Sequence, residues 1–211
     1  MEAEREQRVE ALVALARRWA DDPAIAAARD GSNLVLGAGN PLARLVLIGE
    51  APGGQEEKAG RPFVGPAGKL LDEAFAAAGL ARDEVWITNV VKFRPTVPGV
   101  GNRRRNRAPT RDESQLFLPW LREELAIIEP KALVCLGATA ARAMIGQPVK
   151  IMSERGRWFT SLGGRPTMLT YHPAFLLRRT TDYPERFAEL ASDLRTAGSF
   201  VEADDAPRAA R

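Results

Sequence analysis

The sequence contains a single cysteine, Cys135, and a single histidine, His172. One cysteine excludes an internal disulfide and any metal site built from several cysteines. Because Cys135 lies in the apolar run 132–136, we expect a buried thiol and not a nucleophile. A mechanism that needs an imidazole must use His172. No apolar run approaches the roughly 20 residues that span a bilayer, and residues 1–8 lack a signal-peptide core. We therefore expect a cytoplasmic protein.

Positive charge is concentrated in one segment, although the net charge of the 211 residues is only +3. Between residues 92 and 111 the sequence has no acidic residue and seven basic ones: Lys92, Arg94, Arg103, Arg104, Arg105, Arg107 and Arg111. Prolines and glycines in the same segment predict a loop. A loop with this charge density suggests a polyanionic partner such as a nucleic acid. A solvated or disordered loop is the alternative interpretation.

Helical and strand patterns alternate along the chain. Hydrophobic spacing and capping signals predict helices over 2–20, 66–79, 110–128, 137–145 and 184–197, and strands over 44–48, 84–91, 131–136 and 166–170, with a hairpin-like segment at 151–162. Strands separated by helices imply a parallel sheet covered on both faces. We expect a single α/β domain over 1–200, with a helical extension at 1–32 and a disordered tail at 201–211.

Polar or small residues stand directly after each of the four predicted strands. Glu50 follows the first strand, Asn89 closes the second, residues 137–139 follow the third, and His172 follows the fourth. In a parallel sheet these strand ends lie on one edge, where α/β proteins place their ligand chemistry. A purely structural role is the alternative for each residue. Asn89 could cap a turn, and His172 could be a buried core imidazole.

Four motifs in the same order resemble the uracil-DNA glycosylase superfamily, and its family 4 branch in particular. They are Gly49–Gly53 (GEAPG), Gly60–Gly65 (GRPFVG), Thr88–Lys92 (TNVVK) and Tyr171–Ala174 (YHPA). The resemblance covers residues 33–194. It implies a three-layer α/β/α fold around a central four-stranded parallel sheet. It also implies an enzyme that flips uracil out of single- or double-stranded DNA and hydrolyses its N-glycosidic bond, and it leaves the acceptance of other deaminated bases open.

The resemblance assigns roles to individual residues. The uracil pocket would include Gly49, Glu50, Ala51 and Glu56, with Phe63 stacking on the base, Asn89 reading its polar edge and His172 meeting the carbonyl beside the bond that breaks. The catalytic residues would be His172, Glu50 and Asn89. DNA contacts would come from Arg103, Arg104, Arg105 and Arg107, and from Leu176, Leu177, Arg178 and Arg179, where a leucine would wedge into the gap left by the flipped base.

The sequence departs from the superfamily pattern in three places. Ala51 stands where many members have an aspartate that activates water, so the water-activating residue stays open. A tyrosine that excludes thymine in the classical enzymes has no counterpart near Gly53. Family 4 members typically bind a 4Fe–4S cluster through four cysteines, but Phe93 and Phe117 stand at two of these positions and the other pair has no counterpart before Asn33. We therefore expect no cofactor and no metal.

Two other functions stay open at this stage. The first is a protein that traps uracil-DNA without turnover, as close relatives with a histidine in the basic loop do; residues 101–107 contain no histidine, which argues against it. The second is a nucleotide-binding α/β protein with no role on DNA, which would leave the basic loop unexplained. We expect a glycosylase that acts as a monomer.

Overall fold

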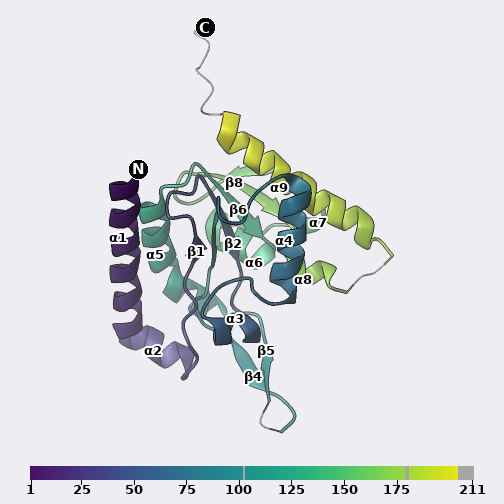
Figure 1. The fold of residues 1–211 in the computed structure, drawn as a ribbon. Coiled ribbons are helices and arrows are strands. Elements are labelled where there is room, and N and C mark those ends of the chain that lie inside the picture. Colours follow the sequence, from purple (N-terminus) through teal and green to yellow (C-terminus); the bar gives the residue numbers. More distant parts are fainter. Residues whose placement is uncertain (102, 179–180, 204–211) are drawn as a thin grey trace.

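A computed structural model describes residues 1–101, 103–178 and 181–203 of the protein (Figure 1). The helices are α1 (Glu2–Asp21), α2 (Pro23–Arg29), α3 (Gly54–Ala59), α4 (Pro66–Ala78), α5 (Arg111–Ile128), α6 (Ala138–Ile145), α7 (Ile151–Glu154), α8 (Pro173–Leu176) and α9 (Tyr183–Ala203). The strands are β1 (Ala38–Gly39), β2 (Leu45–Gly49), β3 (Trp86–Asn89), β4 (Thr96–Pro98), β5 (Arg104–Asn106), β6 (Ala132–Leu136), β7 (Trp158–Thr160) and β8 (Pro166–Thr170).

The main sheet of the described residues has the strand order β1-β3-β2-β6-β8-β7. Its centre is parallel, because β2 pairs with β3 and β6 and β6 pairs with β8 in the same direction. This confirms the predicted central parallel sheet. Two edge strands add to it, β1 antiparallel to β3 and β7 antiparallel to β8. With 2 and 3 residues, they are too short to give a recognisable alternation of apolar and polar residues.

Helices cover both faces of the sheet, as the three-layer α/β/α prediction requires (Figure 1). Side chains alternate across a strand, so Val46 and Ile48 of β2 enter a core formed with α1, α5 and α6. Leu45 and Leu47 enter a second core formed with α4 and α9. Strand β2 is buried along its whole length, which explains its uninterrupted apolar sequence.

The N-terminal helices pack onto the domain. Leu15 and Trp19 of α1 are buried in the same core as α5, and Ile25 of α2 joins them. The carboxylate of Asp22 accepts hydrogen bonds from the backbone N–H groups of residues 24 and 25, which ends α1 and caps α2. No helix among residues 1–101, 103–178 and 181–203 is long and apolar enough to cross a membrane.

Two segments differ from the sequence prediction. The basic segment contains the antiparallel hairpin β4–β5, with Thr96 opposite Asn106, instead of a plain loop. The closing helix α9 continues to Ala203 with Val201 buried, so residues 201–203 are helical and not a disordered tail. The rest of the predicted tail, 204–211, lies outside the described residues.

The carboxyl ends of the parallel strands meet at one edge of the sheet. Gly49 at the end of β2 pairs in register with Asn89 at the end of β3, and Leu136 of β6 pairs with Thr170 of β8. The segments that follow β2, β3, β6 and β8 therefore begin side by side. This arrangement confirms that the four predicted strand ends share one edge of the sheet.

Candidate active site

A cavity of about 330 Å³ opens at this edge of the sheet. Its walls come from the segments after β2 and β8, the end of β3 and the end of the β4–β5 hairpin. The predicted site residues that line it are Glu50, Ala51, Glu56, Phe63, Asn89 and His172. The volume is in the range expected of small-molecule sites, near its lower end. The chain thus brings these six residues together in one cavity, whereas Gly49, the other residue predicted for the uracil pocket, does not line it.

The loop that carries Phe63 is held in a strained conformation. Phe63 has a φ of 52°, in the left-handed region that residues with a side chain rarely adopt. The carboxylate of Glu56 accepts hydrogen bonds from the N–H groups of Val64 and Gly65 at 3.0 and 2.7 Å, and from that of Gly53 at 3.1 Å. Glu56 lines the cavity as predicted, but its oxygens are occupied by this loop. It therefore fixes the position of the Phe63 ring.

Two further contacts, which the sequence did not reveal, hold the same loop. The guanidinium of Arg82 donates to the carbonyl oxygens of Pro62 and Phe63 at 3.0 and 2.9 Å. Gly68 of α4 packs so closely that a Cβ there would lie 1.9 Å from the Phe63 carbonyl oxygen. Both contacts join residues that only the folded chain brings together, so no local pattern marks them.

Asn89 ends strand β3 with its side chain buried beside the Phe63 ring. Its Oδ1 atom is buried and has no hydrogen-bond partner among the residues that the structure describes. Gly49 makes this arrangement possible, because a Cβ there would lie 2.4 Å from Asn89 Oδ1 and 2.6 Å from Phe63 Cζ. An unpaired buried carbonyl oxygen costs free energy unless a ligand supplies a donor. Asn89 therefore offers an unpaired acceptor to a donor group in the cavity.

His172 caps the short helix α8, and this contact fixes its tautomer. Its Nδ1 accepts a hydrogen bond from the backbone N–H of Ala174 at 3.1 Å. The neutral imidazole therefore carries its proton on Nε2. Burial lowers the pKa of His172 to about 4, and the negative charge of Glu56 partly opposes this shift. The ring lies 5.6 Å from the Phe63 ring, measured between centroids. His172 is thus a neutral N–H donor at neutral pH.

A titration tests this protonation state directly, because the chain has one histidine. The NMR signal of the imidazole C–H protons should shift with a midpoint near pH 4. Folding stability should fall as the pH drops from about 6.5 towards 4, since the unfolded chain then binds a proton that the folded chain does not. A midpoint near the ordinary value of about 6.5 would contradict this lowered pKa.

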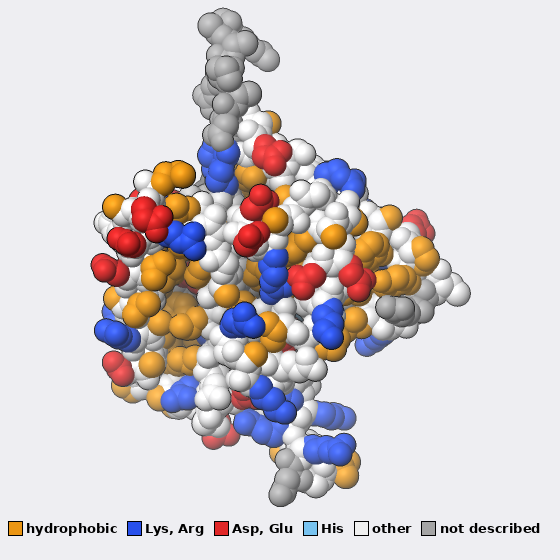
Figure 2. Space-filling view, viewed as in Figure 1, with side chains coloured by type: hydrophobic (Ala, Val, Ile, Leu, Met, Phe, Trp, Pro, Cys, Tyr) orange, Lys and Arg blue, Asp and Glu red, His pale blue; other side chains and the backbone are white. Residues whose placement is uncertain are grey.

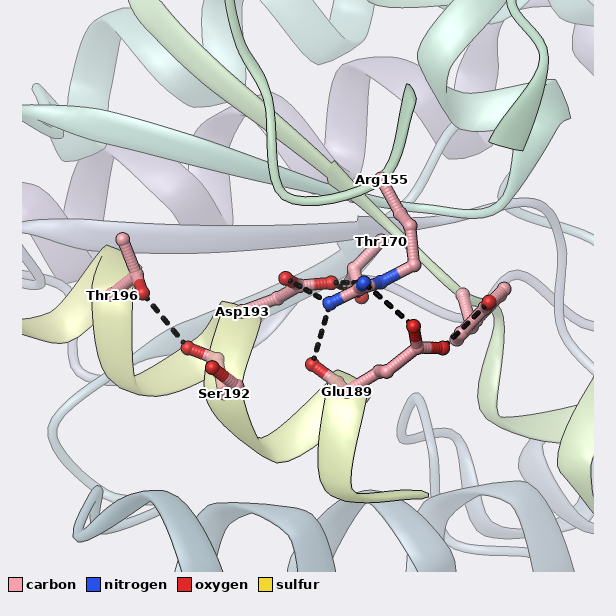
Figure 3. Close-up of polar contacts among 7 residues, drawn as sticks. Arg155, Thr170, Glu189, Ser192, Asp193 and Thr196 are labelled. Atoms are coloured by element: carbon pink, nitrogen blue, oxygen red, sulfur yellow. Dashed lines mark hydrogen bonds and ion pairs between the residues drawn. The ribbon is translucent and has the colours of Figure 1, made fainter. Parts of the chain in front are cut away.

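A network of charged side chains holds the end of strand β8, directly before the histidine (Figure 3). Arg155 donates to Asp193 at 2.6 and 3.0 Å and to Glu189 at 3.0 Å. Asp193 also accepts a hydrogen bond from the Thr170 hydroxyl at 2.7 Å, and Glu189 accepts one from the Tyr171 hydroxyl at 2.8 Å. Burial is the main cause that raises the pKa of Tyr171 to about 12. The network ties β8 to α9 and restrains the chain where the histidine begins.

Glu50 is linked to the end of the third parallel strand. The hydroxyl of Thr139, in the first turn of α6, donates to Glu50 Oε2. Residues 137–139 therefore take part in the site through this contact, although they do not line the cavity. The carboxylate of Glu50 lies at the cavity wall, where it can orient a water molecule or face a positive charge.

The basic segment divides into paired and exposed side chains. Lys92 is fully buried and bonds to Glu124 at 2.6 Å, Arg94 bonds to Asn106, and Arg107 pairs with Glu113 at 2.5 Å. The charge count thus overstated the free positive charge, because it ignored partners elsewhere in the chain. Arg103, Arg104 and Arg105 are exposed on the hairpin, where Lys and Arg side chains gather on the surface (Figure 2).

The four residues predicted to contact DNA after the histidine motif differ in their positions. Leu176 is only 3% exposed and packs in the core below α8, so its assignment to the DNA surface is wrong. Leu177 is 40% exposed and lines the cavity, and Arg178 is exposed. Arg179 lies outside the described residues. Leu176 and Leu177 point in different directions at the end of α8, and the sequence alone did not indicate which of the two is buried.

The family of the chain follows from comparison with known proteins. Residues 36–195 match the family model of the uracil DNA glycosylase superfamily. The chain belongs to the uracil DNA glycosylase superfamily. It is 40% identical to the type-4 uracil-DNA glycosylase of Thermotoga maritima over 81% of this chain and 84% of the relative. For the type-4 enzyme of Pyrobaculum aerophilum, the identity is 37% over 70% of this chain and 74% of the relative.

The superfamily fold is also found in a solved structure. SMUG2 of Pedobacter heparinus superposes with a TM-score of 0.52 at 14% identity, over 74% of this chain and 76% of that one. This likeness concerns the fold alone.

The 4Fe–4S cluster implied by the resemblance to family 4 does not fit this member of the superfamily. Such a cluster needs four cysteine ligands, and the chain has one cysteine, Cys135, which is buried in β6. Burial raises the pKa of its thiol well above the usual range. Phe93 and Phe117 stand at two of the expected ligand positions, buried, with their rings 5.9 Å apart. Among the described residues, no group of three or more His, Cys, Asp or Glu could hold a metal ion.

The purified protein should accordingly be colourless and contain no stoichiometric iron. The reason is the number of ligands, since two phenylalanines and one buried thiol cannot hold a cubane cluster. Metal analysis together with the absorbance near 400 nm provides the measurement. A band there that bleaches with dithionite would contradict the assignment.

Proposed function

We propose that this protein is a monofunctional uracil-DNA glycosylase, which flips uracil out of DNA and hydrolyses the bond between the base and the sugar. The observation that carries the proposal is a cavity that combines a stacking ring, an unpaired amide oxygen and an imidazole N–H donor, in a chain of the uracil DNA glycosylase superfamily. The product would be an abasic site in an otherwise intact strand.

The protein would recognise uracil by hydrogen bonds to the polar edge of the base and by stacking on the face of its ring. The ring of Phe63 offers an aromatic surface for the planar base. Asn89 Oδ1 accepts a hydrogen bond from N3–H of uracil, and the amide NH₂ donates to O4. Cytosine has an acceptor at N3 and a donor at N4, so it meets the amide with both polarities reversed. The buried position of Asn89 makes that mismatch costly, because neither group can turn to water.

Hydrolysis moves charge in two directions. As the bond between C1′ and N1 breaks, its electron pair leaves with uracil, and the sugar becomes positively charged. Nε2–H of His172 donates to O2 of the departing base and stabilises the negative charge there. Water adds to C1′ and releases a proton, and uracil is finally protonated. The carboxylate of Glu50, held by Thr139, orients this water and faces the positive sugar.

DNA binding would involve the hairpin and the segment after the histidine. The exposed guanidinium groups of Arg103 and Arg105 suit phosphate contacts, and Arg104 joins them although its Nε donates to Thr96. The exposed Leu177, beside the cavity, is the side chain that would fill the gap left by the flipped base.

Replacing Arg103, Arg104 and Arg105 together with alanine should weaken DNA binding for all sequences. Each lost phosphate contact should lower the slope of log K against log salt by about one unit. Affinities measured at several salt concentrations provide the test. The matched control replaces Arg5 and Arg17, which are exposed on α1, and should leave the slope unchanged. An unchanged slope in the hairpin variant would show that the hairpin points into solvent.

One incubation separates this function from its alternatives. A uracil-containing oligonucleotide is mixed with the protein and then treated with alkali, which cleaves abasic sites. Strand cleavage that depends on the protein and on uracil supports a glycosylase. A persistent protein–DNA adduct would indicate a trap, and an unchanged oligonucleotide would indicate a protein that does not act on uracil in DNA. The lack of a histidine in the hairpin region 101–107 argues against the trap.

We also infer that the protein acts as a monomer in the cytoplasm. The residues proposed to bind and process uracil all come from one chain, so the site needs no second copy. In a cell without a nucleus, a DNA substrate would place the activity in the cytoplasm.

A further inference from the structure

A second hollow of about 670 Å³ lies between helices α5 and α6, and the function proposed above does not use it. We name it the α5–α6 groove. Arg111 begins α5 at one end of the groove, Arg122 lies further along the same helix, and Arg142 faces them from α6. Its floor is partly apolar, with Leu118 and the half-exposed Leu162.

The groove carries positive charge without compensation. None of the residues described as lining it is acidic, whereas three are arginines, Arg111, Arg122 and Arg142. All three are exposed, and within the described part of the chain they have no ion pair. Other arginines near α5 are paired, as Arg18 is with Glu123 at 2.7 Å. A concave surface that keeps its cations unpaired attracts an extended anion.

The groove lies next to the base cavity. Thr139 lines the groove and donates its hydroxyl hydrogen bond to Glu50, which lines the base cavity. Arg107 lines the base cavity, and the next residue, Ala108, lines the groove. At both places, residues that line the two hollows are direct neighbours. The two hollows are therefore neighbours on the surface, and a DNA strand with one nucleotide in the base cavity would pass close to the groove.

We propose that the α5–α6 groove binds the sugar–phosphate backbone of the uracil-carrying strand, on one side of the flipped nucleotide. This inference rests on the proposed glycosylase function. Arg111 and Arg122 are eleven residues apart on α5, which corresponds to about 16 Å along the helix axis. Successive phosphates of one strand are about 3.4 Å apart along the axis of a duplex and further apart along the strand itself, so a groove of this length can contact more than one of them. An acidic peptide would match the charge, but the position of the groove beside the base cavity favours DNA.

The test compares DNA lengths. Single-stranded oligonucleotides carry a 2′-fluorinated deoxyuridine, which resists hydrolysis, and extend from it by two or by ten nucleotides on either side. The parent should gain affinity when the strand is extended on one side. The double variant Arg122→Gln, Arg142→Gln should lose most of that gain, roughly tenfold at 0.1 M salt, because about 0.7 counterions are released per phosphate contact on a single strand. Glutamine retains good helix propensity, so both helices should persist.

The ratio of affinities for long and short oligonucleotides is the readout, and it removes general effects of the substitutions on the protein. Arg5→Gln on α1 is the matched control and should keep the parental ratio. An unchanged ratio in the double variant would overturn the proposal and would leave an acidic protein partner as the occupant of the groove. Failure of the glycosylase function would be seen separately, as the absence of uracil release by the parent from ordinary substrate.

Discussion

Replacing His172 with alanine should slow uracil excision about a hundred- to thousand-fold while DNA affinity stays nearly unchanged. A donor aimed at a developing oxyanion contributes roughly 3–4 kcal/mol to the transition state. His172 has the tautomer that this role requires, because Nδ1 accepts the N–H of Ala174 and the proton is left on Nε2. Single-turnover kinetics at saturating enzyme is the right measurement, since it removes the contribution of binding.

A second variant separates chemistry from folding. The imidazole also caps α8, so its loss could loosen the segment that follows. His172→Gln keeps an amide that can accept the backbone N–H or donate to the base, and it should retain more activity than His172→Ala. Thermal unfolding of both variants shows whether the fold is intact. Excision by folded His172→Ala at the parental rate would show that His172 is not the donor, and the chemistry would then have to be sought around Glu50 and Glu56.

Replacing Asn89 with alanine should reduce excision about a hundredfold or more, through recognition of the base. The variant leaves N3–H and O4 of bound uracil without the partners that Asn89 supplies, at about 1–3 kcal/mol for each group. Unlike the histidine variant, it should also weaken binding to DNA that carries a non-hydrolysable uracil nucleotide, relative to the same DNA with thymine. Affinity and single-turnover rate measured together distinguish the two effects.

The control for this variant is Asn33→Ala, which makes the same chemical change at an exposed position. It should leave both affinity and rate at parental values. A parental excision rate for Asn89→Ala would mean that the buried, unpaired Oδ1 atom does not face the substrate. In that case, selection of uracil would depend on the shape of the cavity.

The sequence allowed a good prediction of the parallel sheet because its two central strands, β2 and β6, are apolar along their whole length. Strand β2 is buried on both faces, and such a run is hard to assign to a surface element. A parallel arrangement of the strands was enough to place Glu50, Asn89 and His172 at one edge. Glu56 and Phe63, by contrast, were assigned to the site only through the resemblance to the glycosylase superfamily.

Other features depend on contacts between distant residues, which no local pattern reveals. Arg82 clamps the Phe63 loop across 19 positions in the sequence. Lys92 belongs to a positively charged run but is neutralised by Glu124 of α5. Leu176 and Leu177 are identical in type, and only the docking of α8 decides that the first is buried and the second exposed. Tertiary packing determines each of these outcomes.

The central claim is that the protein releases free uracil from DNA and leaves the strand intact. The direct measurement incubates uracil-containing duplex DNA with substoichiometric protein and quantifies free uracil by mass spectrometry alongside alkali-labile sites. We predict equal amounts of both, in excess over the protein, with no strand break before alkali. Uracil that stays attached to DNA or protein, or strand cleavage without alkali, would contradict the assignment of this chain as a monofunctional uracil-DNA glycosylase.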